Sequence, residues 1–335
     1  MFNIIRRAYY RCNIDILYIH CEGIGQSIMK HLFIINPIAG KGKALEYIPK
    51  IEEYFSRMKD LFFIEVTKYP GHAIELVKQY VDKETYRVYS VGGDGTLNEV
   101  LNGMAGSDSS LAIIPAGSGN DFIKSIRNYS VDKESPEKNI MKITSKVSLL
   151  ERLVKGTESF IDIGKINNRY FINISSLGFD AEVVYKSHKI KKLPLITGLL
   201  AYVLSVFATL VSYQSNPLKI KIDGQTIEKG TLLVAVANGR YYGGGMQAAP
   251  SAELNDGFLD ICLIEYAKRL RILKLFPKFI KGQHAGIKEV SFHRGKNISI
   301  ISKNKVAMNV DGETNIVEGK VDFEIIPNAV RIVLP

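Results

Sequence analysis

Short apolar runs alternate with helical patterns from residue 29 to about residue 150. Three of the runs, at residues 31–35, 86–91 and 111–114, end in a polar turn that contains glycine. After the second of these turns, apolar residues recur at i, i+3, i+4 and i+7 on one face of a helix: Leu97, Val100, Leu101 and Met104. Strands that alternate with helices in this way predict a parallel α/β sheet.

From about residue 154 the pattern changes to short strands. Asp223-Gly224 lies between two of them and is a strong signal for a hairpin turn. Helical segments at 193–213 and 268–281 interrupt the strands. A chain of 335 residues is expected to form two compact domains. The expected divisions are a parallel α/β domain at 29–153, a β-sandwich at 154–316 and final strands at 317–335.

The turn after residues 86–91 has the composition of a phosphate-binding loop. Gly92, Gly93 and Gly95 allow backbone N–H groups to approach a phosphate closely, with the positive end of the next helix behind them. Asp94 carries a negative charge, so beside phosphates it acts through Mg²⁺ or on a nearby hydroxyl. The turn therefore indicates a nucleoside-triphosphate site.

Two other turns support this interpretation. Residues 36–43 follow the first apolar run and residues 115–121 follow the third, and both are polar and contain several glycines. In a parallel sheet such turns meet at the carboxyl ends of the strands, where open α/β sheets bind ligands. The alternative is that the glycines only permit tight turns. The P-loop, dinucleotide-binding and protein-kinase motifs are absent from the sequence.

In this order, the three turns resemble the catalytic domain of diacylglycerol kinases, and more narrowly the soluble bacterial lipid kinases related to sphingosine and ceramide kinases. The resemblance rests on Asn36-Pro37 with Gly40, on residues 92–99 and on residues 115–121. It covers about residues 29–335 and continues through residues 170–173, 178–181, 255–260 and 309–313. The Gly-Gly-Asp-Gly-Thr segment alone is shared with NAD kinases.

The resemblance implies an active site in the cleft between the two domains, with ATP and Mg²⁺ as cofactors. Asp94 is expected to hold Mg²⁺–ATP, and Asp311 or Glu313 to act as base or orienter at the acceptor hydroxyl. The sequence does not choose between these two. The final strands are expected to return toward the first domain. The expected nucleotide-binding residues are Asn36, Pro37, Gly40, Thr67, Gly92, Gly93, Asp94, Gly95, Thr96, Leu97, Asn98, Glu99 and Ser118.

The resemblance also implies a structural Mg²⁺ ion in an Asn-Asp-Gly-Phe loop. Its ligands would be the Asp256 side chain and the main-chain carbonyls of Glu253 and Phe258, oxygen ligands that Mg²⁺ accepts together with water. The alternative is a plain Asp-Gly turn. Asp121 and Asp162 match an acidic relay near the nucleotide, and their alternative roles are a helix N-cap and a charge at a strand end.

The net charge of +10 favours an anionic partner. Basic residues cluster at 186–192 and 268–281, and the second cluster mixes cations with large apolar residues, as helices at a lipid interface do. The alternative is a solvated helix whose apolar side is core. We expect peripheral binding to anionic membranes. Nucleic acid is not expected as a partner because no recognised module is present, and a homodimer is left open.

Two segments bear on where the protein is located. Residues 193–213 approach the length of a membrane span, but their Ser, Thr, Pro and Gly residues favour a buried or interfacial helix. Residues 1–28 do not share the pattern that begins at Met29, so we favour a mis-assigned start over an amphipathic N-terminal arm. The three cysteines offer no disulfide framework, so the cytoplasm is the expected compartment.

The expected function is that of an ATP-dependent lipid kinase that phosphorylates the hydroxyl of a lipid alcohol. Diacylglycerol is the first candidate, with phosphatidic acid as the product and phospholipid metabolism as the setting. An NAD-kinase-like enzyme is one alternative, because it shares the Gly-Gly-Asp-Gly-Thr turn. A non-catalytic lipid-binding protein is another, although Asp94, Asp311 and Glu313 are all present.

Overall fold

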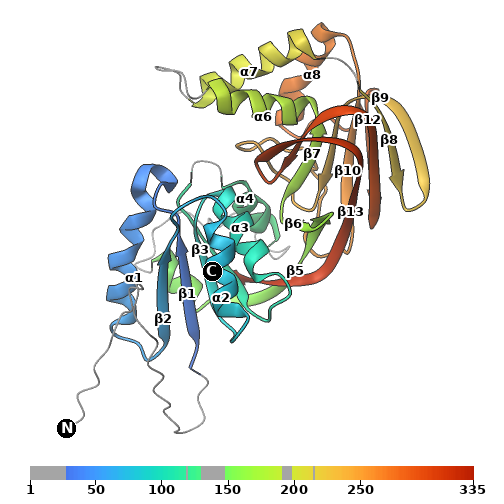
Figure 1. Ribbon diagram of the computed structural model, residues 1–335. Coiled ribbons are helices and arrows are strands. Elements are labelled where there is room, and N and C mark those ends of the chain that lie inside the picture. Colours follow the sequence, from blue (N-terminus) through green and yellow to red (C-terminus); the bar gives the residue numbers. More distant parts are fainter. Residues whose placement is uncertain (1–27, 118–119, 130–147, 191–197, 214–215) are drawn as a thin grey trace, which may run out of the picture. The chain divides into compact units, whose positions relative to one another are not determined.

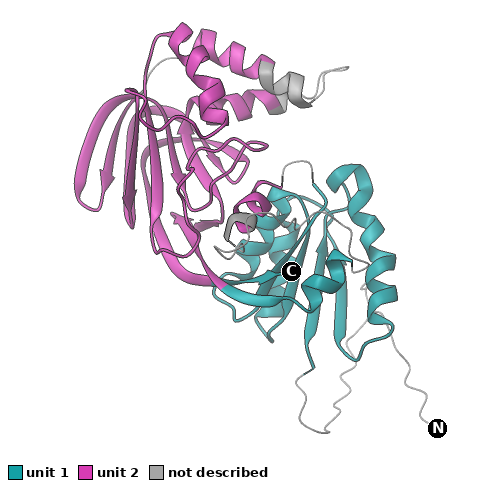
Figure 2. Cartoon of the chain, turned by 180° about the vertical axis from the view of Figure 1, so that it is seen from behind, with its two compact units in different colours: residues 1–118, 137–159, 330–335 teal, residues 119–136, 160–329 magenta. Residues whose placement is uncertain are grey.

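The computed structural model describes residues 28–117, 120–129, 148–190, 198–213 and 216–335. The chain forms two compact units, shown in Figure 2. The first consists of residues 1–118, 137–159 and 330–335, and the second of residues 119–136 and 160–329. Apart from Ile28, the expected N-terminal extension lies outside the described residues.

The first unit is built on a parallel sheet. Its strands are β1 (Lys30–Ile35), β2 (Leu61–Val66), β3 (Arg87–Gly92), β4 (Ser110–Pro115) and the last residues of β13 (Glu313–Leu334). Their order across the sheet is β13-β4-β3-β1-β2 (Figure 1). All residues of β3, and all but the first of β1, are buried. Strands packed on both faces need apolar residues at every position, which explains the continuous apolar runs. The predicted parallel sheet is confirmed.

Helices lie between these strands along the chain. They are α1 (Tyr47–Phe55), which follows the 3₁₀ segment η1 (Ala39–Glu46), then α2 (His72–Val81), α3 (Asp94–Met104) and α5 (Leu149–Val154). The predicted apolar stripe of α3 is buried at Leu97, Val100, Leu101 and Met104. A Cβ atom at Gly103 of α3 would lie 2.8 Å from the Cβ of Val77, so α2 and α3 can approach closely only because this residue is glycine.

The second unit contains mostly antiparallel strands. They are β5 (Thr157–Ile166), β6 (Arg169–Phe171), β7 (Ile174–Gly178), β8 (Asn216–Ile222), β9 (Gln225–Ala237), β10 (Leu259–Glu265), β11 (Val290–Gly295), β12 (Asn297–Val310) and most of β13. β8 pairs with the first parts of β9 and β12, and β7 pairs with their last parts. The predicted change from alternating strands and helices to a strand-rich domain is therefore confirmed.

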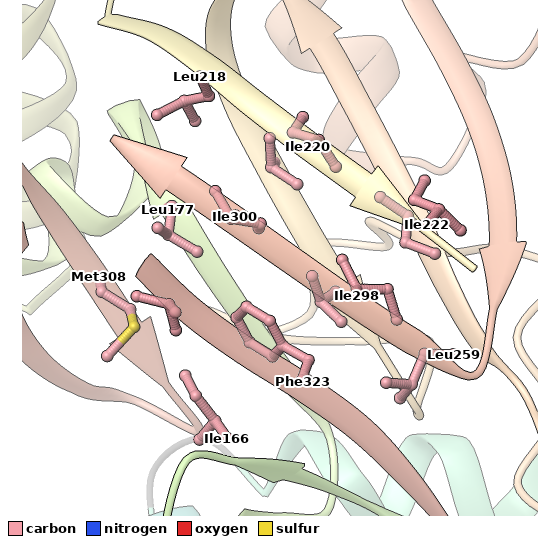
Figure 3. Close-up of a cluster of buried hydrophobic side chains, with 14 of the residues drawn as sticks. Ile166, Leu177, Leu218, Ile220, Ile222, Leu259, Ile298, Ile300, Met308 and Phe323 are labelled. Carbon is pink, nitrogen blue, oxygen red and sulfur yellow. The ribbon is translucent and has the colours of Figure 1, made fainter. Parts of the chain in front are cut away.

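Side chains alternate between two cores in this unit. On β9, Val234 and Val236 join one apolar cluster, whereas Leu233 and Ala235 join another. Figure 3 shows the first cluster, in which Ile220 of β8 and neighbouring residues of β12 meet. The second cluster lies beneath α6 (Phe179–Ile190), α7 (Gly198–Ser212) and α8 (Arg269–Ile280). One face of the sheet is thus covered by helices, as the alternation of period two requires.

His31 in β1 gives the first unit a predicted sensitivity to acid. Its side chain is 1% exposed, and its Nδ1 lies 2.9 Å from the Tyr89 hydroxyl. Burial, together with the Arg87 charge, lowers the pKa of His31 from 6.5 to about 3. The unfolded chain therefore binds more protons below pH 6.5, and the folded state loses about 1.4 kcal/mol of stability per pH unit down to about pH 3.

Between pH 6.5 and pH 5 this one group should therefore cost the wild type about 2 kcal/mol of unfolding free energy. The His31→Gln variant lacks the titrating ring, so its urea midpoint should fall less over the same interval. Equal losses in wild type and variant would show that His31 is not the cause.

Candidate active site

Backbone hydrogen bonds join the three glycine-containing turns at the carboxyl end of the parallel sheet. The N–H of Asn36, after β1, donates to the carbonyl of Val91 at 3.1 Å. The N–H groups of Ala116 and Gly117, after β4, both donate to the carbonyl of Gly92, at 2.8 and 3.0 Å. The turns that the sequence predicted separately therefore meet along one edge.

A side-chain contact reinforces this edge. The Asn36 amide Nδ2 donates to Thr96 Oγ1 at 3.0 Å, and its Oδ1 accepts from the N–H of Ile38 at 3.1 Å. Thr67 follows β2, and its N–H donates to the carbonyl of Ile35 at 2.9 Å. The predicted residues Asn36, Thr67 and Thr96 are thus held at the ends of adjacent strands, with Pro37 directly after Asn36.

Glycine is required sterically at two positions of these turns. Gly40 has a φ of 60°, and a Cβ there would lie 2.2 Å from the carbonyl oxygen of Ala116. A Cβ at Gly92 would lie 2.3 Å from Thr96 Oγ1. At Gly95, in contrast, a Cβ would meet no described atom within 4 Å. Packing within the described chain therefore explains the first two glycines, whereas Gly95 has no steric constraint of this kind.

Asp94 is the first residue of α3 and is partly exposed. Gly93 precedes it in an extended conformation, and the N–H of Leu97 donates to the Gly93 carbonyl at 3.0 Å. The free N–H groups of a helix's first turn carry partial positive charge, so the start of α3 favours an anion. Asp94 thus lies where a cation would be needed between its carboxylate and a phosphate.

Two of the predicted nucleotide-binding residues have other roles in the structure. The Glu99 carboxylate accepts hydrogen bonds from the N–H groups of Gly71 at 2.9 Å and Ala73 at 3.2 Å. Glu99 therefore caps the start of α2 and fixes it against α3. Leu97 is buried in the core of the first unit. Ser118 lies outside the described residues.

Asp311 and Glu313, in the second unit, differ sharply in their surroundings. Asp311 is 8% exposed, and its carboxylate accepts from the backbone N–H groups of Ile172 at 2.8 Å, Asn173 at 3.0 Å and Ile174 at 3.1 Å. The Glu313 side chain is 45% exposed and pairs with Arg169 at 2.7 Å. Asp311 holds the chain between β6 and β7 in place, whereas Glu313 is exposed to solvent.

Asp162 anchors the predicted metal loop. It is 1% exposed, and its two carboxylate oxygens accept from the N–H groups of Gly257 at 2.7 Å and Asn328 at 2.8 Å. Its own N–H donates to the carbonyl of Leu254 at 2.7 Å. Asp162 thus sets the conformation of residues 254–257, a role that its place in the sequence did not reveal.

Asp121 has a comparable role at the start of α4 (Asp121–Tyr129). It is 3% exposed, and its carboxylate accepts from the N–H of Gly244 at 2.6 Å and from Lys124 Nζ at 2.8 Å. Gly243, Gly244 and Gly245 all have positive φ. Glycine adopts positive φ without steric cost, whereas other residues do so rarely. Asp121 therefore connects α4 to a loop whose backbone conformation requires glycine.

The metal loop offers oxygen atoms but also contains a competing cation. Asp256 accepts from the N–H of Phe258 at 3.0 Å, and its other oxygen pairs with Arg294. Arg294 Nε also lies 3.4 Å from Asp260, whose pKa is raised to about 6 by burial and by the nearby Glu253 charge. One Asp260 oxygen has no hydrogen-bond partner among the described residues.

The residues of this loop fit a Mg²⁺ ion in charge and donor type. One carboxylate and main-chain carbonyls are ligands that Mg²⁺ takes, and the nearby Asp260 oxygen without a hydrogen-bond partner among the described residues could accept a further contact. Among the residues that the structure describes, no group of three acidic, His or Cys side chains is arranged to hold a metal. A bound Mg²⁺ would therefore depend on the carbonyls of Glu253 and Phe258, and on release of Asp256 from Arg294.

A narrow apolar cavity of about 50 Å³ lies between α8 and the sheet face that the helices cover. Its lining is mostly aliphatic and aromatic, and the three acidic residues in it are Asp180, Glu265 and Glu289. Burial is the largest influence on the Asp180 carboxyl and raises its pKa. The sequence contained this residue in a family motif but gave it no role.

Comparisons with known proteins agree with this arrangement. Residues 30–166 match the family model described as diacylglycerol kinase catalytic domain, and residues 173–334 match the YegS C-terminal NAD kinase beta sandwich-like domain. Among the residues that the structure describes, no helix is long and apolar enough to cross a membrane. Residues 193–197 of the segment considered above lie outside the described residues.

Relatives extend over nearly the whole chain. A diacylglycerol kinase of Bacillus subtilis (strain 168) is 28% identical over 282 residues, which are 84% of this chain and 88% of that protein. The protein named "Putative lipid kinase YtlR" of the same strain is 31% identical over 316 residues, 91% of this chain and 99% of its own. A crystal structure of a diacylglycerol kinase from Bacillus anthracis str. Sterne shares the fold, with a TM-score of 0.64 at 23% identity over 93% of this chain and 98% of that one. The chain therefore belongs to the diacylglycerol kinase family of lipid kinases.

Proposed function

We propose that the protein transfers the γ-phosphoryl group of ATP to the hydroxyl of a lipid alcohol, and that diacylglycerol is the first candidate acceptor. The observation that carries this proposal is the joined edge of the first unit, where Gly92 accepts two backbone hydrogen bonds from the β4 turn and Thr96 accepts one from Asn36. Family membership supports a lipid acceptor. The product would be phosphatidic acid, which places the reaction in phospholipid metabolism.

In this proposal the first unit binds the nucleotide. Backbone N–H groups of Gly93 and Gly95 and the start of α3 would receive the phosphates, and Asp94 would hold Mg²⁺–ATP. The metal would neutralise the charge that develops during transfer. Phosphoryl transfer needs little covalent chemistry from the protein, so the rigid connection of Asn36, Gly92 and Thr96 would serve mainly to position the phosphates.

The acceptor hydroxyl would meet the pair Asp311 and Glu313. One of these carboxylates would receive the hydroxyl proton or orient the hydroxyl. The two carboxylates differ in their surroundings. Asp311 accepts hydrogen bonds from three backbone N–H groups, and Glu313 is exposed. We further propose that both units take part in the reaction, because the nucleotide residues belong to one and this pair belongs to the other.

Mg²⁺ alone is expected to stabilise the second unit through the Asp256 loop. At a Mg²⁺ concentration of about 100 Kd, binding to the folded state adds about 2.7 kcal/mol. In the absence of ATP, the melting temperature of the wild type should rise with Mg²⁺ and that of Asp256→Ala should not. Asn255→Ala is the matched control, since Asn255 is an exposed neighbour with no predicted ligand role. A wild type whose melting temperature ignores Mg²⁺ would remove the structural metal from this account.

A screen of acceptors tests the proposed function. The purified protein would be given ATP labelled at the γ-phosphate and, separately, diacylglycerol, a monoacylglycerol, a prenol, a sphingoid base and NAD. Transfer to a lipid supports the proposal and names the acceptor. Transfer to NAD would favour the NAD-kinase-like alternative, and lipid binding without transfer to any acceptor would favour a non-catalytic lipid-binding protein.

A further inference from the structure

Helix α7 carries large apolar side chains on its exposed face as well as on its buried face. Val206 and Leu210 are buried against the second unit together with Ser205 and Thr209, whereas Leu204, Phe207 and Val211 are 41%, 52% and 69% exposed. A surface helix of a water-soluble domain normally turns its polar residues outward. In α7 the outward stripe at i, i+3 and i+7 is formed by large apolar side chains instead. Among the described residues, this stripe therefore has no covering partner of the kind that its composition favours.

The start of α8 extends the same stripe. Arg269 donates through Nη2 to the carbonyl of Val211 at 2.7 Å, which places the beginning of α8 beside the end of α7. The next residue, Leu270, is 75% exposed, the second highest value among the exposed large apolar residues of the described chain. Leu204, Phe207, Val211 and Leu270 together form what we call the apolar stripe. Figure 1 shows the two helices on the same side of the second unit, with α6 beside them.

Cations accompany the apolar stripe. Along α8, the positions four, eight and eleven residues after Leu270 are Lys274, Lys278 and Lys281, and all are exposed. None of these lysines forms an ion pair with a described residue, whereas Arg271 on the flank of the helix pairs with Glu289. The segments 198–212 and 269–280 contain no Asp or Glu. The face thus combines exposed apolar side chains with uncompensated positive charge.

From this combination we infer that the α7–α8 face binds an anionic lipid bilayer, with the apolar stripe inserted below the headgroups and the α8 lysines at the phosphates. An exposed apolar patch marks an interaction site. The charge selects among partners, because anionic lipid surfaces attract lysines and accept apolar side chains at once. The inference rests on the proposed function, which supplies the reason for membrane binding. A diacylglycerol substrate stays in the bilayer, and the kinase must reach it there.

The chain offers a direct probe of insertion because it contains no tryptophan. Phe207→Trp places a single indole in the apolar stripe, and Leu61→Trp places one on β2 at a similar exposure, 48% against 52%. Vesicles of phosphatidylcholine with about 30 mol% phosphatidylglycerol present an anionic surface that attracts lysines. They should shift the indole emission of the Phe207→Trp variant to the blue, and brominated acyl chains should quench it. Neither effect is expected for the Leu61→Trp variant.

Substitutions then separate the two components of binding. The Phe207→Ser/Val211→Ser variant should lose at least about tenfold in vesicle affinity, equivalent to about 1.4 kcal/mol. The Lys274→Gln/Lys278→Gln/Lys281→Gln variant should lose affinity for anionic vesicles, and the wild type should lose it when salt is raised, because salt screens the attraction. Leu61→Ser is the control that removes an equally exposed apolar side chain and should bind as the wild type does.

The outcomes distinguish this inference from the proposed function. Unchanged vesicle binding in the Phe207→Ser/Val211→Ser variant would overturn the inference. The inference would also be overturned if sedimentation showed that the wild type is a dimer and the same variant a monomer, because the stripe would then be a subunit interface. Activity on diacylglycerol dispersed in detergent should be equal in wild type and variant. If that activity is present while vesicles leave the emission of the Phe207→Trp variant unchanged, the kinase proposal stands and the docking face is wrong.

Discussion

Asp94→Asn is expected to reduce kcat by at least about 100- to 1,000-fold, the loss typical when an electrostatic contact to the transition state is removed. The substitution keeps the size of the side chain and removes the charge that would hold Mg²⁺ beside the phosphates. Asp94 is partly exposed at the start of α3, so the fold does not depend on its burial. Transfer of the labelled phosphoryl group from ATP tests the expected loss of kcat, and thermal unfolding of the same preparation tests whether the fold is intact.

The matched control is Asp108→Asn. Asp108 is exposed and lies beyond the end of α3, so the variant loses one negative charge near the same helix without touching the phosphate turn. It should turn over at the wild-type rate. Wild-type turnover in Asp94→Asn would remove Asp94 from the site, and equal losses in both variants would point to a general effect of charge.

Asp311→Ala is expected to cause the largest loss of stability, at least about 3 kcal/mol. Its carboxylate satisfies three N–H groups on residues that are themselves buried, and each buried donor without an acceptor costs about 1–3 kcal/mol. A domain is stable by only about 5–15 kcal/mol, so some preparations of this variant would be partly unfolded. Asp311→Asn keeps one acceptor oxygen and suits the φ of 46° at this position, so its loss should be intermediate.

Glu313→Gln supplies the comparison. Its ion pair with Arg169 is exposed, and such pairs contribute about 0–1 kcal/mol, so urea unfolding should be nearly unchanged. A folded Glu313→Gln protein with a large loss of kcat assigns the proton of the acceptor hydroxyl to Glu313. A wild-type rate assigns it to Asp311. An Asp311→Ala protein as stable as the wild type would contradict the positioning role of Asp311.

The sequence predicted the meeting of the three glycine-containing turns because the elements that form them are local. Each turn follows its own apolar strand, and the periodicity of α3 is visible within eleven residues. The rule that parallel strands end at one edge then brings Asn36, Gly92 and the β4 turn together. Glu99 escaped this reasoning because its contacts, with Gly71 and Ala73, lie 28 and 26 residues away.

The second unit was harder to predict because its acids act at long range. Asp162 binds the N–H groups of Gly257 and Asn328, which are 95 and 166 residues distant in the chain. Arg294, which pairs with Asp256, lies in a strand with no local motif. No local pattern links such residues. The contacts by which Asp162 fixes the predicted metal loop, and the pairing of Arg294 with Asp256, therefore appeared only in the structure.

The orientation of α7 shows a different limit. Periodicity identifies which residues share a face of a helix, but not which face packs against the protein. The composition of residues 193–213 indicated a buried or interfacial helix, and the structure buries Ser205 and Thr209 while it exposes Leu204 and Phe207. Hydrophobicity alone does not choose between the two faces, because the buried face contains Val206 and Leu210 and the exposed face contains Leu204 and Phe207.

The central claim is that this protein phosphorylates a lipid hydroxyl with ATP. The most direct test incubates the purified chain with γ-labelled ATP, Mg²⁺ and diacylglycerol in anionic vesicles, and then separates the lipids from the aqueous phase. The account predicts label in phosphatidic acid, dependent on Mg²⁺ and absent with Asp94→Asn. Label that stays in the aqueous phase with every lipid alcohol tested, from a protein that is folded and binds ATP, would contradict it.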